Sequence, residues 1–148
     1  MTTDLPEASG ESAILHASCV AVAGRGLLIL GPSGAGKSAL ALRMLALGAR
    51  LVSDDRVLVM RENGLTARCP APAIHGLIEA RGLGLLRVDP VDRAEVVLVA
   101  DLGRDEDQRL PPRRNITILG MSLPLVLRVQ NDHFPAAMMV YLHGGRQD

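Results

Sequence analysis

Residues 27–38 read LLILGPSGAGKS, and this stretch decides the fold. Residues 27–30 are apolar without polar alternation, which is typical of a strand buried on both faces. The next eight residues, GPSGAGKS, fit G-x-x-x-x-G-K-[ST], the phosphate-binding P-loop. Residues 39–47 are good helix formers, and Gly48 ends the helix. Strand, loop and helix together predict a site for a nucleoside triphosphate or another phosphate.

Each position of this loop has a chemical task. Glycines let the backbone wrap closely and point its N–H groups at phosphate oxygens, and the helix start adds its positive dipole end. Lys37 supplies a mobile ammonium for the β- and γ-phosphates, and the Ser38 hydroxyl can ligate Mg²⁺. Lys37 is also the only lysine among the 16 basic residues. The cofactor-binding candidates are Gly31, Pro32, Ser33, Gly34, Ala35, Gly36, Lys37 and Ser38.

Two adjacent carboxylates, Asp54 and Asp55, follow the next apolar strand at residues 49–52. A P-loop enzyme needs a carboxylate at the carboxyl end of a neighbouring strand, where it holds Mg²⁺ or its water. The two aspartates can divide the work, one as base for an incoming hydroxyl and one at the metal. The alternative is a solvated acidic turn, but the P-loop favours the functional interpretation.

Two further features are ambiguous when taken alone. The segment EARGLG at residues 79–84 combines a carboxylate, a guanidinium and glycines, but a loop with a surface ion pair is the simpler interpretation. His16 lies at the start of an apolar strand, where a packed or edge histidine is more common than a catalytic one.

The rest of the chain is predicted to be mostly strands. Residues 15–30 form a hairpin interrupted at 24–26, and Asn63-Gly64 signals a second hairpin between residues 57–60 and 65–68. Further strands are predicted at residues 85–88, 96–100, 116–119 and 123–129, with a closing helix at 134–143. Residues 70–84 read as irregular and 103–114 as a mobile surface loop. This order predicts an α/β fold, a single P-loop domain with a mixed β-sheet over residues 13–148, after a flexible leader at residues 1–12.

Composition narrows the function classes. The 148 residues carry 16 basic and 16 acidic side chains, and aromatic residues make up 1%. The lack of a basic excess and of stacking rings argues against a nucleic-acid partner. No apolar run approaches the ~20 residues that span a bilayer, and residues 1–12 lack the basic start of a signal peptide. Cys19 and Cys69 form no CxxC pair, which suits a reducing compartment. We expect a cytoplasmic protein without membrane attachment.

The motifs taken together resemble the catalytic domain of HPr kinase/phosphorylase, the bacterial serine kinase of the phosphocarrier HPr in the sugar phosphotransferase system. The resemblance rests on His16 placed 21 residues before Lys37, on GPSGAGKS, and on SDDRV at residues 53–57. Its most discriminating part is IEARGLGLL at residues 78–86, and ILGMSLPL at 118–125 is a weaker match. The chain is similar to short forms that lack the family's N-terminal domain.

The resemblance implies roles for individual residues. Asp54 would accept the proton of the target serine, and in reverse would help inorganic phosphate attack phosphoserine to give pyrophosphate. Asp55 and Glu79 would lie at the Mg²⁺ with Ser38, His16 would support Asp54 or the phosphates, and Arg81 lies within the signature. ATP and Mg²⁺ would be the cofactors and HPr the partner. The family assembles as a homo-hexamer and has a fold like the nucleotide domain of phosphoenolpyruvate carboxykinase.

One segment departs from the family pattern. The family carries a basic Gly-Arg-Asn loop before its C-terminal helix, whereas residues 130–134 read QNDHF without arginine. Two other functions therefore stay open: a nucleotide-binding regulator without kinase activity, and a kinase for a small metabolite. A GTPase is disfavoured because its Asn-Lys-x-Asp motif needs a second lysine.

Overall fold

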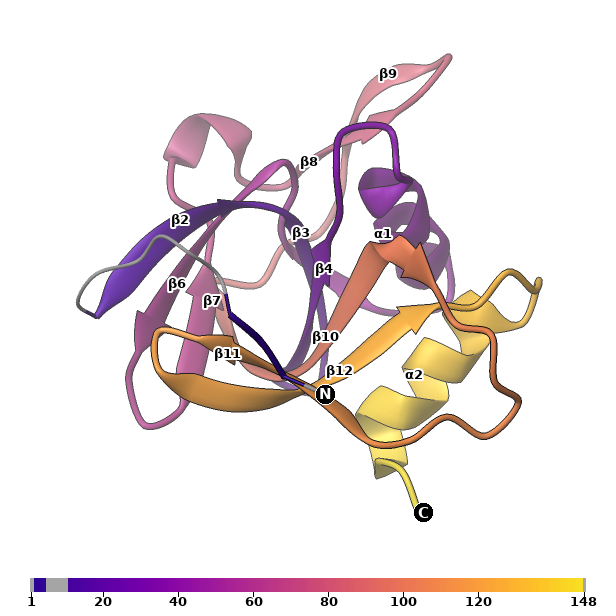
Figure 1. Cartoon of the computed structure of the whole chain (residues 1–148). Coiled ribbons are helices and arrows are strands. Elements are labelled where there is room, and N and C mark those ends of the chain that lie inside the picture. Colours follow the sequence, from indigo (N-terminus) through magenta and orange to yellow (C-terminus); the bar gives the residue numbers. More distant parts are fainter. Residues whose placement is uncertain (1, 5–10, 148) are drawn as a thin grey trace.

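The computed structural model describes residues 2–4 and 11–147, which form a strand-rich domain with helices on one side (Figure 1). The strands are β1 (Thr2–Asp4), β2 (Ser12–His16), β3 (Ser18–Val22), β4 (Arg25–Leu30), β5 (Arg50–Ser53), β6 (Arg56–Arg61), β7 (Leu65–Arg68), β8 (Leu77–Ala80), β9 (Gly84–Arg87), β10 (Arg93–Asp105), β11 (Arg114–Ile118) and β12 (Met121–Arg128). The helices are α1 (Lys37–Ala46) and α2 (Phe134–Gly144), with a 3-10 turn at Pro72–Ile74.

β10 organises the main sheet because it pairs with three other strands. It runs parallel to β4 and β12, and its first residues run antiparallel to β7. The main path across the sheet is β1-β11-β12-β10-β4-β3-β5, and β2 and β6 extend it from β7. Parallel and antiparallel pairs thus coexist, which confirms the predicted mixed sheet.

The strand β4, the helix α1 and the strand β5 form a βαβ unit that crosses over one strand. β3 lies between β4 and β5 and is antiparallel to both, so β4 and β5 point the same way. The carboxyl ends of β4 and β5 therefore meet the first residue of β3 at one edge of the sheet. The P-loop, Asp54 and Ser18 all lie at this edge.

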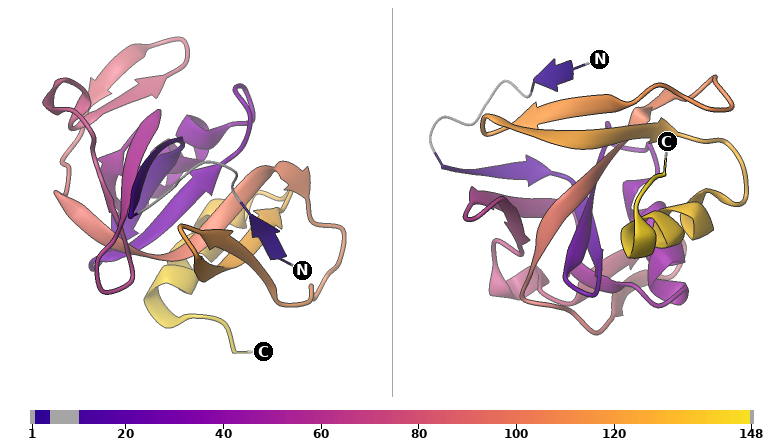
Figure 2. Two further views of the ribbon diagram at one scale, coloured as in Figure 1. Left: turned by 60° about the vertical axis from the view of Figure 1, so that its left-hand side comes forward. Right: turned by 90° about the horizontal axis from the view of Figure 1, so that it is seen from below.

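The main sheet has a buried apolar cluster on each face. Leu27 and Ile29 of β4 pack in the cluster that includes residues of α1 and α2, whereas Leu28 packs in the cluster built from β6, β7, β11 and β12. All three side chains are fully buried, which confirms the predicted strand buried on both faces. Figure 2 shows the two helices on one side of β4 and β10.

The predicted elements match the structure in most places and fail in a few. Both hairpins and both helices are present. The turn between β3 and β4 lies at Ala23-Gly24 and not at the predicted residues 24–26. Both turn residues have positive φ, as a tight hairpin turn requires. The irregular interpretation of residues 70–84 is wrong for its second half, where β8 and β9 form a separate hairpin. The strand predicted at residues 85–88 is present as β9, whereas β8 has only four residues, too few to show a period in the sequence.

The predicted leader, residues 1–12, falls mostly outside the described residues. Within it, Thr2–Asp4 runs parallel to β11, and Ser12 is the first residue of β2. The leader and the domain boundary at residue 13 stay predictions.

The predicted surface loop at residues 103–114 is shorter than expected. Its first three residues extend β10, and an ion pair closes its base. Arg114 Nε donates to Glu106 Oε1 at 3.1 Å and Nη2 donates to Oε2 at 2.9 Å. Both side chains are nearly buried, and the Arg114 guanidinium holds the pKa of Glu106 below its usual value. This bidentate ion pair joins β11 to the end of β10.

We predict that Glu106→Gln lowers the melting temperature by several degrees at pH 7. The substitution removes one of the two hydrogen bonds from Arg114, whose guanidinium stays nearly buried. A carboxyl whose pKa is depressed by folding stabilises the protein above its unfolded pKa, near 4.5, and loses this contribution as the pH falls through the folded pKa. The difference between variant and wild type should therefore shrink in acid. Thermal unfolding followed by circular dichroism at pH 7 and pH 3 measures both effects.

Glu95→Gln is the matched control, because Glu95 is exposed and the described residues give it no ion pair. A Glu106→Gln penalty that persists unchanged at pH 3 would show that the loss comes from packing and not from the charge.

Candidate active site

The P-loop, the first turn of α1 and the β8–β9 hairpin surround one cavity of about 530 Å³. Its walls include residues of the P-loop and the first turn of α1, together with His16, Ser18, Asp55 and Glu79. These residues come from separate parts of the chain. The βαβ unit brings them together by placing the ends of β4 and β5 beside the start of β3.

The P-loop has the backbone that phosphate binding requires. Gly34 and Gly36 have φ values of 85° and 100°, in the left-handed region that suits glycine. Gly36 caps α1 without a side-chain hydrogen bond, and the first turn of α1 has no acidic residue, so its N–H groups and its dipole favour an anion. Lys37 Nζ donates to the carbonyl oxygens of Gly31 at 2.7 Å and Pro32 at 3.1 Å, which keeps the ammonium at the loop.

Asp54 is buried behind the wall of the cavity, with 6% of its surface exposed. The hydroxyls of Ser18 and Ser38 both donate to its Oδ1 at 2.7 Å, and the backbone N–H of Glu79 donates to its Oδ2 at 3.2 Å. A buried carboxylate is costly unless donors surround it, and these three donors come from β3, α1 and β8. Asp54 therefore has one fixed orientation next to the P-loop serine.

Sequence reasoning missed Ser18. It is fully buried and opens β3, two residues after His16. Its signal is weak, because a single serine at the start of an apolar strand is common. Only the register of β3 between β4 and β5 shows that its hydroxyl lies at the carboxylate.

Asp55 points away from its neighbour. Its φ is 73°, a left-handed conformation that aspartate tolerates better than most residues. The carboxylate Oδ1 lies 3.2 Å from His16 Nε2, and both side chains are more than half exposed. The backbone kink thus separates the two carboxylates: Asp54 bonds to Ser38 behind the cavity wall, and Asp55 meets His16 at the exposed side of the cavity.

The β8–β9 hairpin forms another wall of the cavity, to which it contributes Glu79, Arg81 and Leu83. In the part of the chain that the structure describes, Glu79 and Arg81 form no ion pair with each other. The surface-ion-pair interpretation of this segment is therefore wrong. Glu79 lines the cavity and also contacts Asp54, because its backbone N–H donates a hydrogen bond to that carboxylate.

Residues that could hold a magnesium ion line this cavity. Its candidate ligands, Ser38, Asp55 and Glu79, offer oxygen atoms, which Mg²⁺ prefers. Across residues 2–4 and 11–147, no group of three or more His, Cys, Asp or Glu side chains is placed to hold a metal. Such sparse protein ligation is typical of Mg²⁺, which takes its other ligands from water and substrate phosphates.

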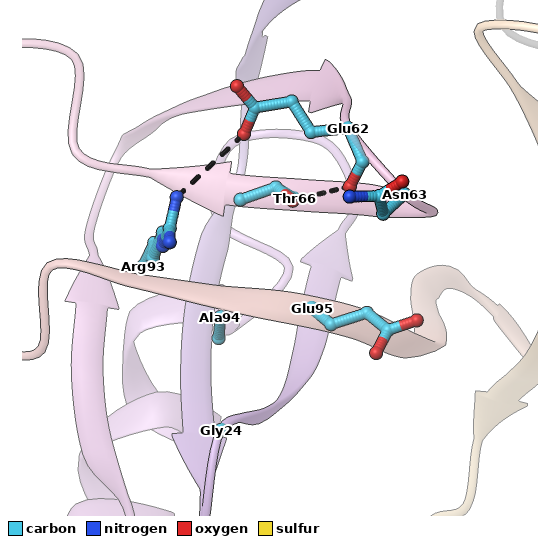
Figure 3. Close-up of a pocket in the computed structure, with 7 residues that line it drawn as sticks. All are labelled: Gly24, Glu62, Asn63, Thr66, Arg93, Ala94 and Glu95. Atoms are coloured by element: carbon cyan, nitrogen blue, oxygen red, sulfur yellow. Dashed lines mark hydrogen bonds and ion pairs between the residues drawn. The ribbon is translucent and has the colours of Figure 1, made fainter.

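Another hollow lies at the opposite end of β4, beside the β6–β7 turn (Figure 3). Glu62 in its wall is partnered, because Oε1 lies 3.7 Å from Arg68 and 4.0 Å from Arg93. This hollow is remote from the P-loop and has no link to the candidate site.

Neither described helix is long and apolar enough to cross a membrane.

Comparisons with known proteins agree with this geometry. The family described as the HPr Serine kinase C-terminal domain matches residues 7–98, which is more than half of the chain. The HPr kinase/phosphorylase of Cupriavidus necator is 33% identical over 135 residues, covering 82% of this chain and 42% of the relative. That of Burkholderia lata is 35% identical over 127 residues, covering 77% of this chain and 39% of the relative. The chain thus spans about two fifths of the length of these curated relatives.

A solved structure supports the same conclusion. The structure titled as the Hpr(Ser) kinase/phosphatase from Coxiella burnetii superimposes with a TM-score of 0.73 at 26% identity, covering 88% of this chain and 94% of that one. This match confirms the expected α/β fold. By family match, sequence identity and fold, the chain belongs to the HPr serine kinase C-terminal domain family.

Proposed function

We propose that the chain is an ATP-dependent protein serine kinase domain whose acceptor is the phosphocarrier HPr or a paralogue. Family membership supports the reaction class. The observation that carries the proposal is the buried Asp54 carboxylate, hydrogen-bonded to Ser38 of the P-loop. The carboxylate proposed as base for the acceptor hydroxyl thus contacts the loop proposed to hold the nucleotide phosphates.

In the forward reaction, the P-loop N–H groups and Lys37 hold the β- and γ-phosphates of ATP. Asp54 accepts the proton of the acceptor serine, whose oxygen forms a bond to the γ-phosphorus. The bond from the γ-phosphorus to the β,γ-bridging oxygen breaks, and ADP leaves. Mg²⁺ would neutralise charge on the phosphates, with Ser38, Asp55 and Glu79 as its candidate ligands.

We assign Ser18 a positioning role for Asp54. Ser38 can ligate Mg²⁺ through an oxygen lone pair while its hydroxyl proton stays bonded to Asp54, so it serves both groups in this proposal. Ser18 is buried beneath the carboxylate and has no competing task. Ser18 and the Glu79 N–H then keep Asp54 oriented toward the acceptor.

The remaining parts of the proposal follow from the family resemblance. They are phosphorolysis of phosphoserine-HPr by inorganic phosphate, a homo-oligomer, and a cytoplasmic location. His16 would support this chemistry through Asp55, which it meets at 3.2 Å.

We predict that Asp54→Asn lowers the rate of phosphotransfer about 10²–10⁴-fold, because it removes the general base while keeping the shape of the side chain. Lys37→Ala should abolish nucleotide binding as well. The assay incubates the protein with γ-labelled Mg-ATP and the HPr paralogues of its host, and it measures label on serine. Asp92→Asn is the matched control, because its carboxylate is fully exposed and lies outside the cavity.

Full activity in Asp54→Asn would contradict its role as base. Absence of label on HPr, together with Lys37-dependent nucleotide binding, would point to the regulator or to another acceptor.

The positioning role of Ser18 is tested by Ser18→Ala. We expect kcat to fall about tenfold with the KM for ATP unchanged, since one hydrogen bond contributes ~1–1.5 kcal/mol and 1.4 kcal/mol corresponds to a factor of ten. Ser18→Thr retains the hydroxyl and should recover most of the loss. Equal losses in both variants at matched melting temperatures would assign Ser18 a packing role only.

A further inference from the structure

An arginine at the end of β12 binds the backbone of the P-loop. Arg128 Nη1 donates to the carbonyl oxygen of Ala35 at 3.3 Å, and Nε of the same guanidinium donates to Asp105 Oδ1 at 2.9 Å. Arg128 therefore connects the loop to the end of β10. It lines a hollow of about 400 Å³ beside the loop, outside the cavity that Asp55 and Glu79 line.

The sheet brings these groups together. β4 and β12 lie on either side of β10 and run parallel to it, so the carboxyl ends of all three strands reach the same edge. The register of β10 against β12 shifts between Asp101 and Asp105, and Asp105 lies opposite Arg128. The backbone N–H of Glu106 also donates to the carbonyl oxygen of Arg128 at 2.8 Å. The backbone position of Arg128 is thus fixed by its pairing with β10.

The carboxylate of Asp105 fixes the direction of the guanidinium. Its other oxygen, Oδ2, accepts a hydrogen bond from Gln130 Nε2 at 2.8 Å. The hydrogen bonds from Arg128 and then from Gln130 hold the pKa of Asp105 below its usual value, so the group is ionised at neutral pH. The N–H donors of an arginine lie in one rigid plane, so the bond at Nε limits where the Nη donors point. One of them points at the P-loop.

The carbonyl that Arg128 binds belongs to the peptide group between Ala35 and Gly36. This peptide is trans, so its C=O and N–H groups point in opposite directions. A donor that holds the carbonyl on the β12 side therefore turns the Gly36 N–H to the other side of the loop. Gly36 borders the cavity there, together with Lys37 and Ser38.

We propose that Arg128 is a positioning residue of the P-loop, which holds the Ala35–Gly36 peptide with its N–H directed at the site of the nucleotide phosphates. This inference rests on the proposed function, which assigns the phosphates to this loop. Without the guanidinium the peptide is free to rotate, and phosphate binding must then order it at a cost in affinity. Arg128 acts through the loop backbone and does not touch the phosphates.

The sequence offers a selective probe of this peptide. Only two alanines precede a glycine, Ala23 and Ala35. Protein labelled with ¹³C at the alanine carbonyl carbon and with ¹⁵N in glycine therefore gives two signals in a carbonyl–amide correlation spectrum, one from Gly24 and one from Gly36. Gly24 precedes β4 and the P-loop follows it, so the Gly24 signal is an internal control at the opposite end of that strand.

We expect Arg128→Ala to move the Ala35 carbonyl carbon upfield in the free protein, because the carbonyl loses a charge-assisted hydrogen bond. Added tripolyphosphate should move the Gly36 amide proton downfield in the wild type and less in the variant, and the Gly24 signal should stay in place. Calorimetry should show about tenfold weaker binding of tripolyphosphate and of Mg-ATP to the variant. Arg109→Ala is the matched control, because Arg109 is exposed and lies outside both hollows.

Two further variants separate positioning from other roles of an arginine. Asp105→Ala removes the anchor of the guanidinium and should weaken tripolyphosphate binding. An Arg128 that binds phosphate directly would instead be released by Asp105→Ala, and binding would be unchanged or tighter. Arg128→Lys retains the charge without the planar fork, so it should recover little of the lost affinity.

The outcomes separate this inference from the function on which it rests. Unchanged or tighter binding by Asp105→Ala, full recovery by Arg128→Lys, or an unmoved Ala35 carbonyl signal in Arg128→Ala would each overturn the inference while the P-loop function stands. Equal movement of the Gly24 and Gly36 signals in Arg128→Ala would also overturn it, because Arg128 would then have a general structural role. If neither tripolyphosphate nor Mg-ATP shows binding that Lys37→Ala removes, the proposed function itself fails.

Discussion

The buried carboxylate of Asp54 is the interaction on which the site depends. It accepts hydrogen bonds from β3, from the first turn of α1 and from β8, so one side chain joins three segments that are distant in the sequence. A buried carboxylate with fewer donors would be destabilising, which is why these partners and the carboxylate require one another. The same bonds that stabilise the charge also aim it at the P-loop. Structure and proposed chemistry thus use the same set of contacts.

The sheet supplies the frame for this arrangement. β4 and β5 are parallel with β3 between them, so loops that follow two separate strands open on one edge. Apolar clusters on both faces bury Leu27, Leu28 and Ile29 of β4 completely, which gives the P-loop a rigid anchor. The end of β12 holds the loop from outside the cavity, through the hydrogen bond of Arg128 to the Ala35 carbonyl.

Much of this could be predicted from local patterns. The P-loop, the β3–β4 and β6–β7 hairpins and both helices depend on residues close in sequence, so their signals are strong. The strand β8 escaped prediction because its four residues are too few to show a period, whereas its partner β9 lies where a strand is predicted. Ser18 and Arg128 escaped for another reason: the contact of each depends on a strand register that joins segments distant in the sequence. The roles of the site residues remain predictions, although the positions of Asp54, Ser38 and Lys37 agree with them.

Lys37 has one more consequence for the chemistry of the protein. It is the only lysine of the chain, and its side chain is nearly buried with Nζ bonded to two loop carbonyls. Acetylation, or any other acylation of a lysine amine, has no alternative side chain on which to act, since the remaining basic residues are arginines. A single acyl group would remove the charge that the phosphates need. Every lysine-directed modification of this protein thus coincides with its phosphate site, and burial of the amine limits how readily a reagent or enzyme can reach it.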